Sequence, residues 1–109
     1  MIRFVPFETD KTAGMIALDS GEIEIGRCEF LLDGYSMRFL SVECQDDIIT
    51  EGLARASMNY AANRYAYIAE IGKDISSPAF FRLGFSGEEI LRVEIPEALS
   101  SGCSCGNAN

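Results

Sequence analysis

The sequence predicts an α+β protein with a mixed, mostly antiparallel sheet, one long helix and one short helix. In residues 1–44, short apolar runs are separated by turn signals, which is typical of strands joined by hairpins. Residues 48–64 change to the periodicity of an amphipathic helix. A strand, a short helix at 77–83 and a last strand follow, so strand–helix–strand units close the chain.

The first two strands are expected at residues 1–7 and 14–18. Pro6 cannot donate a ladder hydrogen bond, so the first strand is expected at an edge of the sheet. The segment Asp19-Ser20-Gly21 is a turn signal and leads to a third strand at 22–32. The apolar positions of this third strand change parity after Gly26, which predicts a β-bulge there.

A fourth strand is expected at Tyr35–Cys44, directly after the strong hairpin signal Asp33-Gly34. Apolar residues occupy both of its faces, Met37 and Phe39 on one and Leu40, Val42 and Cys44 on the other. This pattern is typical of a central strand that is covered on both sides.

The long helix is expected at residues 48–64, and Asp46 and Asp47 are good N-cap residues for its start. A strand at 65–71 follows, and the right-handed crossover rule makes it parallel to the fourth strand. Three tyrosines, Tyr60, Tyr65 and Tyr67, occupy positions suited to packing in the core. Tyr67 alone is kept as a candidate substrate contact.

The segment Ser77–Phe85 predicts a short amphipathic helix that is closed by a glycine and followed at once by a strand. Pro78 suits the first helical position, Ser77 can cap the helix, and Gly84 can take the left-handed conformation that ends it. The last strand is expected around residues 89–95, with Pro96 as its end. Residues 1–100 are therefore expected to form one domain, followed by a small polar, Cys-containing tail at 101–109.

Charge and composition exclude several classes of partner. The 109 residues include 17 acidic and 9 basic residues, for a net charge of −8. Nucleic acids and anionic membranes bind basic surfaces, so neither is expected as a partner. The apolar run at the N-terminus is too short for a signal peptide, and no apolar stretch approaches the ~20 residues of a membrane helix. A cytoplasmic location is expected.

Histidine is absent, which excludes Cys-His and Ser-His nucleophiles and any histidine-ligated metal within one chain. The four cysteines are expected to be reduced in a cytoplasm. Cys103 and Cys105, separated by one residue, are candidate ligands of a soft metal or a redox pair. The tail supplies only two thiolates, so incidental thiols in a flexible tail are the favoured interpretation and no metal is expected.

Four segments together resemble the GCN5-related N-acetyltransferase (GNAT) superfamily. They are Ser20-Gly21-Glu22-Ile23-Glu24-Ile25-Gly26, similar to the early Asp-Gly-x-x-x-Gly hairpin; Phe39-Leu40-Ser41-Val42, similar to the fourth strand; Ile49-Thr50-Glu51-Gly52-Leu53, similar to the start of the long helix; and Arg82-Leu83-Gly84-Phe85, similar to the late Lys-Leu-Gly-Phe junction. The resemblance covers roughly residues 14–95 and implies the acyl-CoA N-acyltransferase fold.

The resemblance implies an acyl-CoA-dependent N-acetyltransferase that binds acetyl-CoA after the fourth strand. Backbone groups at the strand end would contact the pantetheine, and amides at the start of the long helix would bind the phosphates. By resemblance, the cofactor-binding residues are Ser41, Val42, Glu43, Gln45, Ile49, Thr50, Glu51 and Gly52. Glu43 and Glu70 are candidate general bases, against the interpretation that both are solvated strand residues.

Three departures from the family pattern oppose that activity. The phosphate loop lacks its glycines and has Asp46 and Asp47 where a phosphate would lie. Phe80 stands where many members have a tyrosine that acts as general acid. Only about 13 residues precede the strand at Gly14, too few for the two helices that form the family's acceptor cleft.

Three functions therefore remain open. The first is an acyl-CoA-dependent N-acetyltransferase, and the second is a degenerate GNAT-fold binding or interaction module without enzymatic activity. The third is a thiol or metal site formed by Cys103 and Cys105. On chemical grounds, the three departures favour the binding or interaction module over the acetyltransferase. The sheet is expected to have an exposed edge, through which two copies of the chain could form a homodimer. Such a dimer could also complete a cleft.

Overall fold

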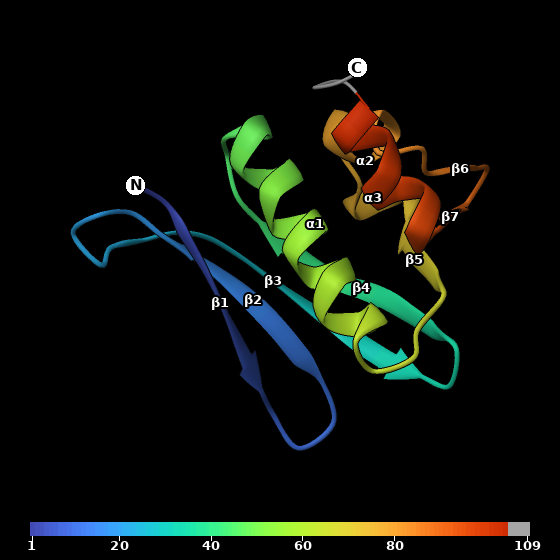
Figure 1. The fold of residues 1–109 in the computed structure, drawn as a ribbon, viewed down its shortest axis with the longest axis horizontal. Coiled ribbons are helices and arrows are strands. Elements are labelled where there is room, and N and C mark those ends of the chain that lie inside the picture. Colours follow the sequence, from blue (N-terminus) through green and yellow to red (C-terminus); the bar gives the residue numbers. More distant parts are fainter. Residues whose placement is uncertain (105–109) are drawn as a thin grey trace.

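The fold was determined as a computed structural model, which describes the backbone of residues 1–104 and the side chains of residues 1–100. Within these residues one seven-stranded sheet has the strand order β1-β2-β3-β4-β5-β7-β6 (Figure 1). The strands are β1 Arg3–Glu8, β2 Ala13–Leu18, β3 Glu24–Asp33, β4 Ser36–Glu43, β5 Ile68–Gly72, β6 Ser86–Gly87 and β7 Ile90–Glu94. The helices are α1 Asp47–Ala62, α2 Pro78–Arg82 and α3 Ile95–Ser104, with a 3-10 turn η1 at Lys73–Ile75.

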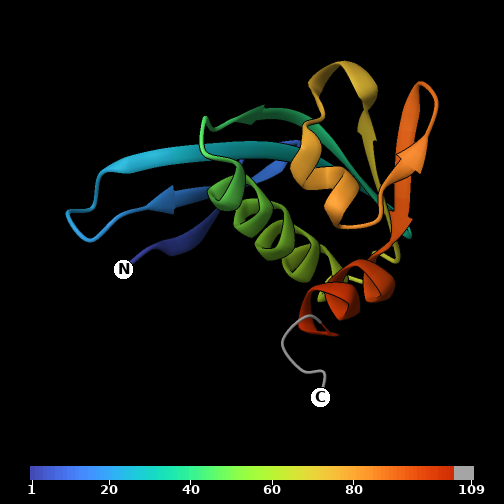
Figure 2. The same cartoon turned by 90° about the horizontal axis from the view of Figure 1, so that it is seen from above.

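The predicted fold class is confirmed. All strand pairs are antiparallel except β4 and β5, which are parallel and joined through α1. The α1, α2 and α3 helices lie on the same face of the sheet (Figure 2). Among the described helices, none combines the length and the hydropathy needed to cross a bilayer.

The α3 helix was not anticipated by the sequence analysis. The last strand ends at Glu94, and Pro96 lies in the first turn of α3. Proline is tolerated there because the first helical amides have no partner within the helix. Residues 101–104, which were assigned to the tail, continue this helix. A proline that was expected to end a strand therefore helps to begin a helix.

The strand expected to begin at Tyr65 begins at Ile68 instead. Tyr65 has a φ of 76° and its amide donates to the Ala62 carbonyl, so it closes the end of α1. Tyr65 and Tyr67 are 82% and 48% exposed, so the expectation that they pack in the core was wrong. Tyr60 does pack inward, with its ring edge-on to Phe30.

The third strand contains a bulge, one residue before the predicted position at Gly26. Ala17 lies opposite Gly26 and Leu18 opposite Glu24, so Ile25 has no partner in the register. After the extra residue, Gly26, Cys28 and Phe30 all turn toward the helices and are buried, whereas Ile23 before it is 61% exposed.

A second bulge, in β4, corrects the expectation that this strand is covered on both sides. Phe39 lies opposite Phe30 and Ser41 opposite Glu29, which leaves Leu40 as the extra residue. The bulge shifts the parity, so Val42 packs against the core on the same face as Phe39. Leu40 stays on the other face and is 45% exposed. The apolar residues after the bulge do not define a second buried face.

The core is centred on aromatic side chains between the sheet and α2. The Phe39 ring lies edge-on to the rings of Phe80 and Phe85, with centroid distances of 5.3 and 6.4 Å. Phe80 and Phe85 also contact each other at 5.3 Å. These edge-to-face contacts fix α2 and the segment after it against β4.

Replacing Phe39 with alanine is expected to lower the free energy of unfolding by about 3–5 kcal/mol, because it opens a cavity beneath α2. Phe81→Ala is the matched control, since the Phe81 ring is 54% exposed. Urea unfolding of both variants checks the prediction. Equal losses for the two variants would contradict the central role of the aromatic cluster.

Candidate functional site

The strands β4 and β5 separate at their carboxyl ends. Their parallel pairing runs from Ser36 opposite Ile68 to Phe39 opposite Ile71 and stops there. Beyond this point β4 continues to Glu43, paired only with β3, whereas β5 turns into η1. The predicted pantetheine contacts, Ser41, Val42 and Glu43, lie on this separated end of β4.

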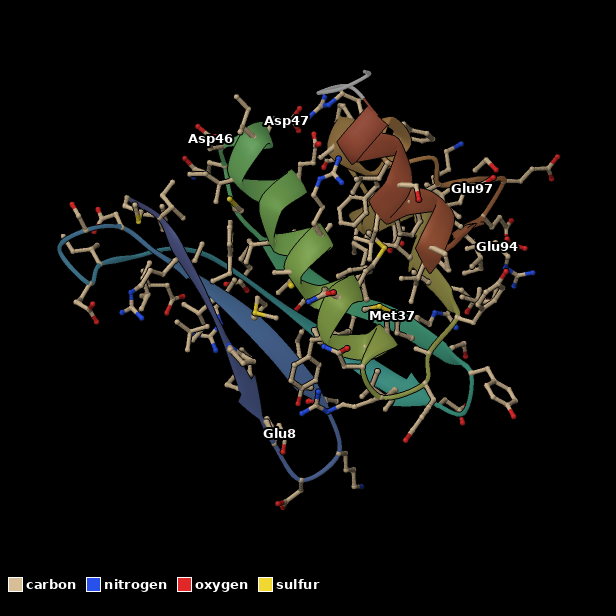
Figure 3. The ribbon with its side chains drawn as sticks, in the orientation of Figure 1. Glu8, Met37, Asp46, Asp47, Glu94 and Glu97 are labelled. Carbon is tan, nitrogen blue, oxygen red and sulfur yellow. The ribbon has the colours of Figure 1, made fainter. Side chains whose placement is uncertain are left out.

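The start of α1 is capped by Asp46, as the sequence predicted (Figure 3). One carboxylate oxygen of Asp46 accepts hydrogen bonds from the Ile48 and Ile49 amides, at 2.9 and 3.1 Å. The Asp46 carbonyl accepts from both the amide and the hydroxyl of Thr50, each at 2.9 Å. The donors that would bind a phosphate are therefore already engaged within the chain.

The first turns of α1 are tied to α2 by a single arginine. The Arg82 guanidinium contacts the carboxylates of Asp47 at 2.7 Å and Glu51 at 3.2 Å. Glu51 also accepts a hydrogen bond from Arg55 at 3.0 Å. Hydrogen bonds to Asp47 and Glu51 raise the pKa of Arg82, so the guanidinium is held in its charged form.

The remaining predicted phosphate contacts are used for packing. Thr50 is buried, and its hydroxyl bonds to the turn before the helix. Gly52 lies under the ring of Phe4 from β1, and a Cβ at this position would overlap that ring. The single glycine in this region thus allows β1 to approach α1, and it does not form a phosphate loop.

The short helix α2 places a phenylalanine where the family pattern has a tyrosine. Phe80 is 1% exposed within the aromatic cluster. Gly84 has a φ of 102°, so the expected left-handed position after α2 is confirmed. Ser77 occupies the N-cap position, but its hydroxyl makes no capping hydrogen bond and is buried without a partner. The expected side-chain cap of α2 was therefore wrong.

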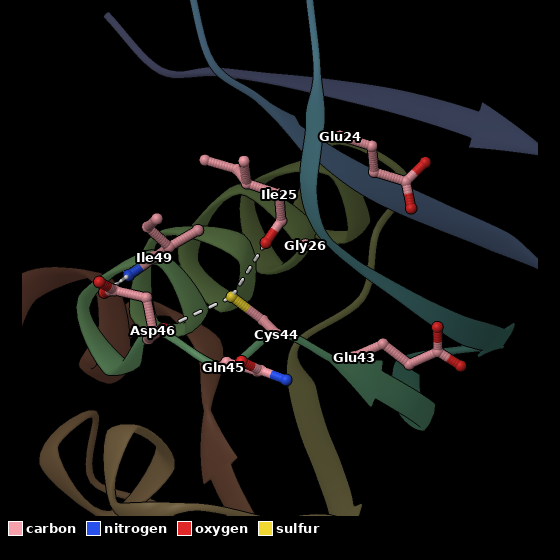
Figure 4. A pocket seen from close by; sticks show the side chains of 8 residues that line it. All are labelled: Glu24, Ile25, Gly26, Glu43, Cys44, Gln45, Asp46 and Ile49. Atoms are coloured by element: carbon pink, nitrogen blue, oxygen red, sulfur yellow. Dashed lines mark hydrogen bonds between the residues drawn. The ribbon is translucent and has the colours of Figure 1, made fainter.

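A cavity of about 570 Å³ lies between the bulge of β3, the end of β4 and the start of α1 (Figure 4). Its ionisable lining consists of the carboxylates of Glu24, Glu43 and Asp46 and the thiol of Cys44, and Gln45 and Ile49 also line it. The Cys44 thiol donates toward the Asp46 carbonyl at 3.4 Å and the Ile25 carbonyl at 3.8 Å. Three carboxylates make this cavity unfavourable for an anion.

The two candidate bases lie on different strands, and one has an ion-pair partner. Glu43 is exposed at the end of β4, on the rim of the acidic cavity. Glu70 projects from β5 and binds Arg92 of β7 at 2.6 Å. Each carboxylate belongs to its own surface, so the structure does not join them into one acid–base pair.

A second cavity, of about 640 Å³, was missed by the sequence analysis. It is lined by Arg38 of β4, Gly72 at the end of β5, Lys73 and Asp74 of η1, and Glu89 and Ile90 at the start of β7. The charges come from three separate segments, so no local motif marks them. The only sequence signal is the position of Arg38 between Met37 and Phe39, which are buried on the opposite face.

Neither cysteine with a described side chain forms a disulfide. The Cys28 thiol is buried and shares a hydrogen bond of 3.1 Å with the Ser57 hydroxyl. Among the residues with described side chains, no group of three potential ligands is placed to hold a metal ion. Cys103 and Cys105, the candidate metal or redox pair, lie outside the described side chains, so their role stays a prediction.

Replacing Asp46 with alanine is expected to lower the free energy of unfolding by about 1 kcal/mol, because two helix amides lose their acceptor. Asp46→Asn should keep most of that stability, since asparagine is an equally good N-cap residue. Urea unfolding of the two variants provides the comparison. An equal loss in both would mean that the charge of Asp46, and not its hydrogen bonds, stabilises α1.

Burial raises the pKa of Cys28 from 9.0 to about 11, even though the Ser57 hydrogen bond lowers it. The thiol stays protonated in the folded state at pH values where it ionises in the unfolded chain. The contribution of the Cys28 thiol to the free energy of unfolding is therefore fully present below pH 9. It is lost as the pH rises from 9 toward 11. Between these limits the loss should be roughly 2–3 kcal/mol.

Urea unfolding of the wild type and of Cys28→Ala, measured at several pH values across this window, checks the prediction. The stability difference between the two proteins should shrink or reverse as the pH rises, because only the wild type carries this thiol. A difference that is independent of pH would contradict the burial of a neutral Cys28.

No protein-family model and no curated protein sequence matches the chain. Solved structures do match it. The GNAT family N-acetyltransferase YhbS from Escherichia coli, solved in complex with CoA, has a TM-score of 0.65 at 15% identity, over 91% of this chain and 83% of YhbS. The spermidine/spermine N-acetyltransferase SpeG from Vibrio cholerae has a TM-score of 0.65 at 12% identity, over 85% of this chain and 72% of SpeG.

A third structure, the PaiA N-acetyltransferase from Thermoplasma acidophilum in complex with coenzyme A, has a TM-score of 0.65 at 12% identity. The match covers 77% of this chain and 61% of the Thermoplasma protein. At these identities the similarity reports on architecture and not on activity. The chain has the fold of the GNAT N-acetyltransferases.

Proposed function

We propose that this chain is a GNAT-fold binding domain that does not use acyl-CoA. The observation that carries the proposal is the Asp46 carboxylate on the Ile48 and Ile49 amides. In the family pattern these helix amides bind the cofactor's phosphates. Here a residue of the chain itself supplies the negative charge and the acceptors that the helix start requires.

A phosphate would have to displace this cap against electrostatic repulsion. Asp46, Asp47 and Glu51 all lie at the start of α1, in a chain with a net charge of −8. The nearby cations Arg55 and Arg82 are already paired with two of these carboxylates. A CoA molecule would bring further negative charge to a surface whose cations are committed. The residues present therefore do not fit the cofactor.

The groups required for acyl transfer are also missing or engaged elsewhere. Phe80 has no proton to donate and is enclosed by other aromatic rings. Glu70 is held by Arg92. The β1 and β2 strands are joined by a turn in which the Thr9 amide donates to the Thr12 carbonyl, so no helix separates them. This arrangement supports a scaffold that binds a ligand or partner without transferring an acyl group.

An acyl-CoA-dependent N-acetyltransferase is the second candidate function. It is favoured by the separation of β4 from β5 beyond Phe39 and by the similarity to structures solved with CoA. In this alternative the cofactor would lie along Ser41, Val42 and Glu43. Glu43 or Glu70 would then be the candidate base for the acceptor amine.

Calorimetric titration of the reduced protein with CoA and with acetyl-CoA separates the two candidates. No binding is expected up to about 1 mM ligand, a limit that corresponds to a binding free energy weaker than about −4 kcal/mol. Asp46→Asn combined with Asp47→Asn removes two charges and keeps a capping residue. This double variant should bind CoA more tightly than the wild type does, because the repulsion is smaller.

Asp10→Asn is the matched control, since it removes one carboxylate from the exposed β1–β2 turn, which lies near the end of α1 and not at its start. It should leave CoA binding unchanged. Micromolar binding of CoA by the wild type would overturn the proposal and would justify a screen of amine acceptors.

A further inference from the structure

Two thirds of the basic residues of this acidic chain are engaged in ion pairs. Six of the nine, all arginines, contact carboxylates: Arg3, Arg27, Arg55, Arg64, Arg82 and Arg92. The side chains of the other three, Lys11, Arg38 and Lys73, make no ion pair or hydrogen bond among the described residues. Two of these three, Arg38 and Lys73, line the same cavity of about 640 Å³.

The cavity also contains two carboxylates, those of Asp74 and Glu89. Within the described part of the chain neither has an ion-pair partner, although both share the cavity with two cations. Two positive and two negative groups therefore line one cavity without neutralising one another through direct contact. The lining is balanced in charge, in contrast to the acidic cavity beside α1.

The charged groups of this cavity come from separate parts of the backbone. Arg38 belongs to the face of β4 that the helices leave open, because Met37 and Phe39 on either side are buried against the helices. Lys73 and Asp74 follow the end of β5, and the Lys73 amide donates to the Glu89 carbonyl at 2.8 Å. Gly72 and Ile90 are paired in the register and also line the cavity. The charges thus come from three segments fixed by the sheet.

We propose that this cavity binds a small zwitterion, a neutral α-amino acid with an apolar side chain. The proposal rests on the proposed function, because it names the ligand class of the binding domain. Arg38 and Lys73 would bind the carboxylate, which a guanidinium can contact through two parallel hydrogen bonds. Asp74 and Glu89 would bind the ammonium group, and Ile90 supplies the apolar surface. The volume lies within the range of small-molecule sites.

Ligands with one kind of charge fit this lining less well. A phosphate would meet Asp74 and Glu89, and a polyamine would meet Arg38 and Lys73. The four side chains are exposed, so water screens each contact and the affinity is low. We expect a Kd of about 0.1–10 mM for the best amino acid.

Titration of the isotope-labelled full chain with L-leucine, followed by amide chemical shifts, tests the proposal. Shift changes that saturate are expected at Arg38, Gly72, Lys73, Asp74, Glu89 and Ile90. Leucine amide lacks the carboxylate, and N-acetyl-leucine lacks the ammonium group. Each analogue should therefore bind with a Kd at least about tenfold higher than that of leucine. Equal binding of either analogue, or tighter binding of inorganic phosphate, would overturn the zwitterion site, as would the absence of shifts at about 50 mM leucine.

Arg38→Gln and Asp74→Asn should each weaken leucine binding about tenfold. Lys11→Gln is the matched control, because Lys11 is the third unpaired cation and lies in the β1–β2 turn. It should leave leucine binding unchanged. The same spectra report whether each variant keeps its fold, and a loss of binding in Lys11→Gln as well would overturn the site.

Adding acetyl-CoA to the leucine-bound protein separates this inference from the proposed function. If the leucine stays unmodified, the result agrees with the zwitterion site and with a binding domain that does not use acyl-CoA. N-acetyl-leucine formed by the wild type and not by Arg38→Gln would keep the zwitterion site and overturn the binding-only function.

Discussion

Strand β4 is the constraint on which the rest of the structure depends. It pairs antiparallel with β3 and parallel with β5, so it joins the hairpin half of the sheet to the crossover half. The bulge at Leu40 turns both Phe39 and Val42 toward the helices. Phe39 then anchors α2 through Phe80, and the end of β4 delivers Asp46 to the start of α1. A β4 strand without the bulge would turn Val42 and the residues after it to the open face.

The start of α1 satisfies its backbone amides with a side chain of the chain itself. A helix start in this fold presents amides that require acceptors, and a phosphate or a carboxylate can supply them. In this chain Asp46 supplies them from within, and Arg82 joins the next carboxylates to α2. The same geometry that could hold an anion is used to stabilise the helix and its neighbour.

The charge distribution in the cavity at the end of β5 differs from that in the rest of the described structure, including the neighbouring Glu70–Arg92 ion pair on the same face of the sheet. Outside this cavity, most arginines form ion pairs with carboxylates. Each pair neutralises negative charge only at its own position on the surface. At the end of β5 the opposite charges stay apart, because the register of β4, β5 and β7 and the η1 turn determine where each side chain begins. Balanced but unpaired charges favour a ligand that carries both signs.

The sequence by itself predicted most of the strands in their order, a bulge close to Gly26, the cap at Asp46 and the left-handed Gly84. Each of these depends on local rules of periodicity, turn chemistry and helix termini. The tertiary structure decided the side on which Leu40 lies, the exposure of Tyr65 and Tyr67, and the start of α3 at Ile95. It also decided that Arg38, Lys73, Asp74 and Glu89 share one cavity. The physical reason is that register and crossover bring distant segments together, whereas sequence patterns report only on residues within a few positions of one another.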